Sequence, residues 1–189
     1  MSLFSYLAES SFITIVVLLL LSIYFVATIW IFFYRYGIIK YYISIEKKSL
    51  DNIYLGNSTT ASTKSLLYKY LHRTTLANRA ILEAAISDTV RNATKGLTIL
   101  SIVASTSPFI GLFGTVIGIL ETFAKLGSNS SSLGVIAPAI SEALVATAAG
   151  IFVAIFAYSF HLIMKRKAYE LNSILKSQAE VIIAQSKED

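Results

Sequence analysis

Three long uncharged stretches constrain the fold of this chain more than any motif does. Residues 10–34 and 96–120 each contain 25 residues without a charged side chain, and residues 126–160 are interrupted only by Glu142. A helix needs about 20 apolar residues to cross roughly 30 Å of hydrocarbon. The sequence therefore predicts an all-α integral membrane protein with three transmembrane helices.

The low share of charged residues supports this class and argues against others. Charged residues make up 14% of the chain, whereas a soluble domain has about 25%. The basic residues form no clustered face and no aromatic platform accompanies them, so no nucleic acid is expected as a partner. The chain has no cysteine, which excludes disulfides and thiolate metal sites. We expect no metal and no cofactor.

The distribution of lysine and arginine predicts the orientation of the chain. Residues 1–11 carry none, residues 35–95 carry ten, residues 121–142 carry one and residues 165–189 carry five. These side chains gather on the cytoplasmic side of a membrane. The N-terminus is therefore expected outside the cytoplasm and the C-terminus inside it.

These runs and counts predict seven segments along the chain. They are an outer N-terminus (1–11), a first span (12–34), a cytoplasmic helical hairpin (35–95), a second span (96–122), an outer loop (123–136), a third span (137–163) and a cytoplasmic C-terminal helix (164–189).

The segment between the first two spans is expected to be helical and to reverse direction once. Turn-forming residues from Asp51 to Thr60 predict the reversal. From Thr63 onward, apolar residues at helical spacing predict an amphipathic helix that runs into the second span. With the extended first and third helices, it would form a cytoplasmic helical bundle.

The second span is rich in glycine. Gly111, Gly114 and Gly118 lie three and four residues apart, a spacing that lets a neighbouring backbone approach closely in lipid. Pro108 removes a backbone donor and predicts a break or kink. Thr115 can bond to carbonyls of its own helix. Close helix packing is a sufficient explanation for these residues taken alone.

The third span has mostly small side chains, which predicts that other helices pack closely against it. A single chain with three helices cannot cover such a surface, so we expect an oligomeric ring in which the first span faces lipid. The small residues are Ala143, Ala146, Ala148, Ala149, Gly150, Ala154 and Ala157. One stripe at helical spacing, which could line a pore, consists of Ala143, Thr147, Gly150 or Ile151, and Ala154.

Glu142 is the only ionisable residue within the third uncharged stretch. Such residues are rare in membrane spans and usually mark a pathway, a partner or a ligand. The apolar run begins at Leu133, so the carboxyl group would lie one to two turns into the helix. The residues that follow Glu142, Ala143 to Phe160, form about 27 Å of helix, which could cross most of the hydrocarbon with the carboxyl group left outside it. A location at the outer interface therefore stays open.

Two motifs strongly resemble those of the ExbB/TolQ family, to which MotA is more distantly related. The motifs are Pro-Phe-Ile-Gly-Leu-Phe-Gly-Thr-Val-Ile-Gly at 108–118 and Ala-Pro-Ala-Ile-Ser-Glu-Ala-Leu-Val-Ala-Thr-Ala-Ala-Gly at 137–150. The resemblance is dense over residues 105–167, and the order of spans extends it to most of the chain. The chain departs from the family pattern at two positions: it has Ala139 where relatives often have glycine, and Ile117 where many have tryptophan. Neither departure removes a titratable group, so they bear on the subfamily rather than on the mechanism.

The resemblance implies a stator subunit of the bacterial inner membrane that is driven by protons. Five subunits would surround two single-span helices of an ExbD- or TolR-like partner, which supplies a membrane aspartate. Thr115, Glu142 and Thr147 would be the polar residues of the proton pathway. A TolA- or TonB-like transducer would receive the force, and the chain would not be an enzyme.

Several alternatives stay open. The short insertion and the three spans argue against a MotA-like protein, and the lack of a long N-terminal extension narrowly favours a TolQ-like one over ExbB. A passive membrane scaffold would explain the glycines without ion flow. An intramembrane hydrolase using a serine and His161 is a remote alternative, because no nucleophile turn accompanies them.

Overall fold

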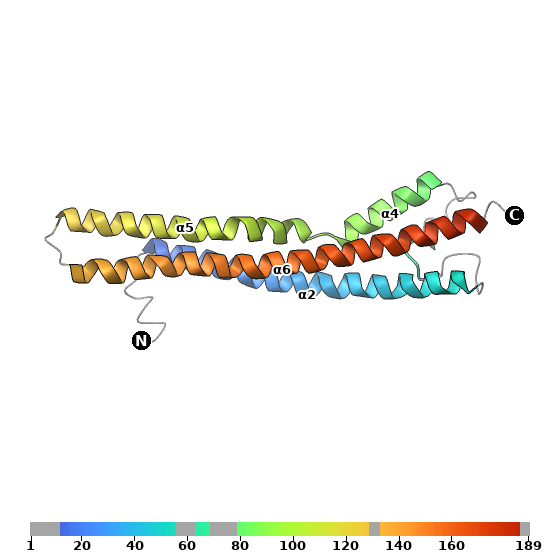
Figure 1. Ribbon diagram of the computed structural model, residues 1–189, viewed down its shortest axis with the longest axis horizontal. Coiled ribbons are helices and arrows are strands. Elements are labelled where there is room, and N and C mark those ends of the chain that lie inside the picture. Colours follow the sequence, from blue (N-terminus) through green and yellow to red (C-terminus); the bar gives the residue numbers. More distant parts are fainter. Residues whose placement is uncertain (1–11, 56–62, 69–78, 129–132, 186–189) are drawn as a thin grey trace. The chain divides into compact units, whose positions relative to one another are not determined.

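The computed structural model describes residues 12–55, 63–68, 79–128 and 133–185 (Figure 1). Three of its helices are long and apolar enough to cross a membrane. The predicted all-α fold with three candidate spans is therefore confirmed within these ranges. Their helices are α2 (Phe12–Tyr54), α4 (Arg79–Ala93), α5 (Leu97–Ser128) and α6 (Leu133–Gln185).

The first and third apolar helices are much longer than a membrane requires. Helix α2 has 43 residues and α6 has 53, whereas about 20 suffice to cross the hydrocarbon. Asp51 and Asn52, which were expected to begin a turn, are still helical, and the Leu55 amide donates to the Asp51 carbonyl at 3.0 Å. Burial of Ile53, which is 2% exposed, outweighs the turn preference of its neighbours.

The expectation of one continuous helix running into the second span is wrong. Helix α4 ends at Ala93 and α5 begins at Leu97. Between them Gly96 has a φ of 101°, which ends a helix and is readily adopted only by glycine. The Leu97 amide donates to the Thr94 carbonyl at 3.1 Å across this turn. Apolar spacing continues across the break, so periodicity alone did not reveal it.

The helix expected from Thr63 onward does not begin there. Residues 63–67 form turns, and Leu67 is fully buried although it is not helical. The rest of the expected reversal, the segment 69–78 and the outer N-terminus at 1–11 lie outside the described residues. Proline does not interrupt the second span, because α5 continues through Pro108.

The chain divides into two compact units. Unit 1 comprises the described parts of residues 1–31 and 98–161, and unit 2 those of residues 32–97 and 162–189. In unit 1, α5 and α6 lie side by side, and the beginning of α2 packs against them (Figure 1). The buried cluster of unit 1 consists of Val17, Leu21, Val103, Ala146, Val153 and Ala157.

Unit 2 contains a fully buried carboxyl group. The Glu46 carboxyl group on α2 accepts hydrogen bonds from the Ser65 hydroxyl at 2.8 Å and from the Leu66 amide at 2.7 Å. Gln178 on α6, also fully buried, donates through Nε2 to the Glu46 carboxyl at 3.0 Å and to its carbonyl at 2.6 Å. One side chain thus joins α2, α6 and the turn at 63–67.

Removing this carboxyl group should destabilise unit 2. Glu46→Ala removes the acceptor of the Leu66 amide and of the Ser65 hydroxyl, and leaves the Gln178 amide only the backbone carbonyl, at a cost of about 2–4 kcal/mol. The matched control, Lys47→Ala, alters an exposed residue on the same turn, where about 0.5 kcal/mol is expected. Thermal unfolding in detergent, followed by circular dichroism, measures both. Equal midpoints for the two variants would contradict this role for Glu46.

Candidate functional site at the contact of α5 and α6

The backbones of α5 and α6 meet without side chains between them at two glycines. A Cβ atom on Gly111 would lie 2.6 Å from the Ala146 carbonyl oxygen, and one on Gly150 would lie 2.5 Å from the Ser107 carbonyl oxygen. Neither distance leaves room for a methyl group. Both sites therefore require glycine as long as the backbones keep this separation.

Gly114 and Gly118 extend the same contact toward the end of α5. A Cβ on Gly114 would lie 3.1 Å from the Ala146 methyl group and from a Val17 methyl group, and one on Gly118 would lie 3.1 Å from the Ala143 methyl group. These neighbours are side-chain atoms and can yield slightly. The glycines thus divide into two positions limited by backbone and two limited by side chains.

Two hydroxyl groups lie at this contact. Thr115 on α5 is buried, and its hydroxyl is within hydrogen-bonding distance of the Thr147 hydroxyl on α6. It can also donate to the Ala143 carbonyl at 3.0 Å, while Thr147 can donate to the Gly111 carbonyl at 3.2 Å. Each hydroxyl therefore has more acceptors than its single hydrogen can serve at once.

Glu142 lies on α6, five residues before Thr147. Its side chain is half-buried. At about 100° per residue, it points some 140° around the helix axis from Thr147. The structure thus joins Thr115 and Thr147 directly and places the carboxyl group on another side of the same helix.

The small residues of α6 occupy different environments in the single chain. Ala143, Ala146 and Gly150 are buried, Thr147 and Ala154 are half-buried, and Ile151 is exposed. The sequence stripe thus combines residues buried against α5, Ala143 and Gly150, with the half-buried Thr147 and Ala154. Pro108 is half-buried within α5. The pore-lining and packing roles expected for these residues stay predictions.

Sequence reasoning missed the polar residues of α2. Thr14 and Thr28 are 2% and 1% exposed, and Glu46 is fully buried. The Thr28 hydroxyl has no hydrogen-bond partner within the described part of the chain. Thr14, Val17, Leu21 and Thr28 fall at helical spacing, so the register of the first span did carry a signal for the two threonines.

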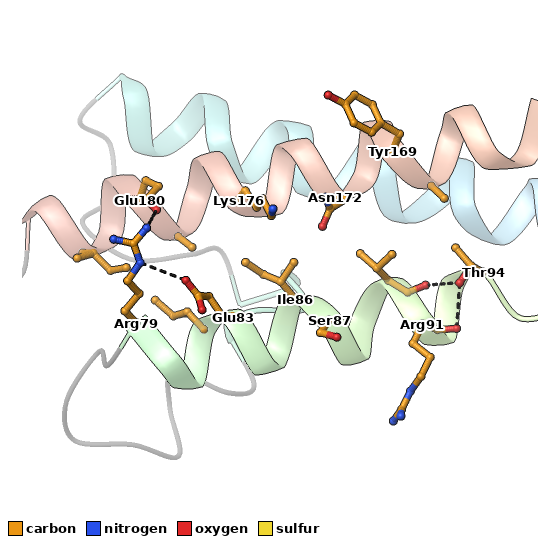
Figure 2. A pocket seen from close by; sticks show the side chains of 15 residues that line it. Arg79, Glu83, Ile86, Ser87, Arg91, Thr94, Tyr169, Asn172, Lys176 and Glu180 are labelled. Carbon is orange, nitrogen blue, oxygen red and sulfur yellow. Dashed lines mark hydrogen bonds and ion pairs between the residues drawn. The ribbon is translucent and has the colours of Figure 1, made fainter.

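A separate groove lies between α4 and the end of α6 in unit 2 (Figure 2). Its volume is about 910 Å³. At one end Arg79 forms ion pairs with Glu83 at 3.1 Å and with Glu180 at 2.8 Å. Exposed pairs of this kind contribute little to stability. Among the described residues, no cluster of three His, Cys, Asp or Glu side chains could hold a metal ion.

Comparison with known proteins identifies the family. Residues 59–177 match the MotA/TolQ/ExbB proton channel family. An ExbB-like biopolymer transport protein of Helicobacter pylori strain J99 is 43% identical over 175 residues, which cover 92% of this chain and 93% of that protein.

Two further relatives are matched over shorter segments. The biopolymer transport protein ExbB of Pseudomonas putida is 41% identical over 86 residues, 45% of this chain and 26% of that protein. ExbB of Neisseria gonorrhoeae is 46% identical over 80 residues, 40% of this chain and 36% of that protein.

The fold and the site define a multi-pass membrane protein with a polar pair between two closely packed helices. The chain belongs to the MotA/TolQ/ExbB proton channel family. The family resemblance found in the two motifs is thereby confirmed. This family is associated with transport rather than with a catalysed reaction.

Enlarging Gly150 should weaken the contact between α5 and α6. Gly150→Ala places a methyl group against the Ser107 carbonyl, which should cost about 1–3 kcal/mol through overpacking. Gly37→Ala is the matched control, because a Cβ there meets nothing within 4 Å, and alanine favours a helix by up to about 1 kcal/mol. Thermal unfolding in detergent should show opposite shifts; a stabilised Gly150→Ala would contradict the contact.

Proposed function

We propose that this chain is the channel subunit of a proton-driven stator in the bacterial inner membrane. The observation that carries the proposal is the hydroxyl pair of Thr115 and Thr147 between two apolar helices. Protons would be the coupling ion, without another cofactor. Together with the family membership, the pair favours ion movement over a purely mechanical role.

The chemistry of the pair suits proton movement. A hydroxyl group can accept a hydrogen bond on one side while it donates on the other. Thr147 contacts both the Thr115 hydroxyl and the Gly111 carbonyl, so its hydrogen can change direction with little movement of heavy atoms. Glu142 would supply a further polar contact along the same pathway.

The proton motive force can supply the necessary work. One elementary charge that crosses 100 mV releases about 2.3 kcal/mol. A few protons per cycle would therefore drive a rearrangement between this subunit and a partner. We propose that the partner is an ExbD- or TolR-like protein with one span, which contributes an aspartate inside the membrane.

A ring of subunits, which we propose to be a pentamer, would place the polar pair around that partner. Large apolar side chains cover the outer side of α2, including Leu19, Ile23 and Trp30 at 58%, 62% and 73% exposure. Such side chains suit lipid. The small residues of α6 permit close neighbours, so α5 and α6 would face the centre of the ring.

The ends of the long helices would lie in the cytosol. Residues 35–95 and 165–189 carry fifteen of the sixteen lysines and arginines, and such residues favour the cytoplasmic side. We therefore place the N-terminus in the periplasm and unit 2, as a helical bundle, together with the C-terminus in the cytoplasm.

The recipient of the force would be a TonB-like or a TolA-like transducer. The relatives reported above are named as ExbB or ExbB-like biopolymer transport proteins, which favours TonB-dependent uptake. The TolQ-like interpretation of the sequence, which would serve the Tol-Pal system and cell division, remains the alternative. A passive scaffold is disfavoured by the family match, because the matching family is one of proton channels.

Purification from the host membrane should yield a complex of several copies of this chain with a smaller single-span protein. Native mass spectrometry would count the copies, and sequencing of the smaller chain would show whether it is ExbD-like or TolR-like. A homo-oligomer that contains no such partner after gentle extraction would favour the scaffold.

Removing the carboxyl group of Glu142 should stop proton movement without dissociating the complex. Glu142→Ala and Glu142→Gln each remove the only carboxyl group between residues 126 and 160, and with it the charged contact that the proposed pathway requires. Glu83→Gln is the control, since Glu83 lies on α4 with a side chain that is 67% exposed.

Proton uptake into vesicles that contain the complex, driven by an imposed membrane potential, measures the effect. Size-exclusion chromatography of each variant verifies assembly. Wild-type uptake by Glu142→Gln would contradict a role for this carboxyl group.

A further inference from the structure

A groove lined partly by hydroxyl groups lies at the surface of α5 and α6 in unit 1, away from the threonine pair. Its volume is about 440 Å³. The proposed function assigns it no role. It is lined by Ser101, Ala104, Ser105, Ala154, Ile155 and Tyr158.

The groove continues the side of α6 that carries Thr147. Ala154 and Tyr158 follow Thr147 by seven and eleven residues, so both lie within about 20° of it around the axis. Tyr158 is about 16 Å farther along the helix, and Ser105 is about 15 Å from Thr115 along α5. Ser105 and Tyr158 therefore lie at about the same level along the two helices. That level is displaced from the threonine pair toward the beginning of α5.

The hydroxyl groups of the groove are available to water. The Ser105 hydroxyl donates to the Ile102 carbonyl at 3.0 Å, which leaves its lone pairs free to accept. Ser101 is exposed and Tyr158 is 58% exposed. Within the described part of the chain, neither hydroxyl has a hydrogen-bond partner. Hydrocarbon would leave them unsatisfied, whereas water would not.

We propose that this groove is a water-filled passage forming the cytoplasmic half of the proton pathway. Water on Ser101, Ser105 and Tyr158 would carry protons from the level of Thr147 toward the cytosol. This proposal rests on the proposed function and on its orientation. The competing assignment, in which Tyr158 is an interfacial anchor that faces lipid, is an outcome of the test.

Because the chain has no cysteine, single cysteines can be introduced into this surface one position at a time. Ser101→Cys and Ser105→Cys would be made in the complex with its partner, in inverted membrane vesicles that expose the cytoplasmic side. A membrane-impermeant, positively charged thiol reagent is the probe. Ile99→Cys is the control, because Ile99 is 50% exposed and lies about 160° around α5 from Ser101.

Both serine positions should react at least about ten times faster than Ile99→Cys, because the reactive thiolate forms only where water reaches the sulfur. In the proposed orientation Ile99, which is nearer the beginning of α5, lies closer to the cytoplasm than either serine. Depth in the membrane alone therefore predicts that Ile99→Cys reacts fastest. Modified Ser105→Cys should also lose proton uptake, while modified Ile99→Cys keeps it.

Three results separate the claims. Equal labelling at all three positions would overturn the water-filled groove and support the lipid-facing assignment. Selective labelling that leaves proton uptake unchanged would overturn the pathway. If the unlabelled wild-type complex takes up no protons although labelling is selective, the proposed function fails and the pathway with it, whereas the water-filled groove stands.

Discussion

The approach of two backbones at Gly111 and Gly150 is the constraint on which the rest of unit 1 depends. A Cβ at either position would meet a carbonyl oxygen of the other helix at 2.6 or 2.5 Å. Only at this separation can the Thr115 hydroxyl reach the Ala143 carbonyl at 3.0 Å and the Thr147 hydroxyl at the same time. The pair of Thr115 and Thr147 can therefore form because Gly111 and Gly150 have no side chains.

The two units solve different packing problems. In lipid, burial of apolar surface does not drive helices together, so dispersion contacts and hydrogen bonds between closely approaching helices must do so. Unit 1 accordingly buries Ala143, Ala146 and Ala157. Unit 2 buries large residues such as Leu171 and Leu175 and can include the Glu46 carboxyl group, because three hydrogen bonds to that group offset part of its desolvation.

The fold was largely predictable from sequence because hydrocarbon admits so few structures. Uncharged runs located all three candidate spans, and the glycine spacing pointed to close packing of the second. The break at Gly96 and the turn at 63–67 escaped notice, since apolar periodicity continues where the backbone changes. Glu46 was missed for another reason: a carboxyl group followed directly by two lysines predicts exposure unless its partners, distant in sequence, are known.

Helix α6 carries packing and polar functions on adjacent sides, and this arrangement limits how either can change. Ala146 and Gly150 hold α5, while Thr147 lies between them in sequence and at the edge of that contact. A larger residue on the packing side would separate the helices and pull Thr115 away from Thr147. The hydroxyl pair thus constrains both the size of its neighbours and the rotation of α6. In the proposed proton cycle, movement would therefore be easier between the proposed ring and its partner than between α5 and α6 themselves.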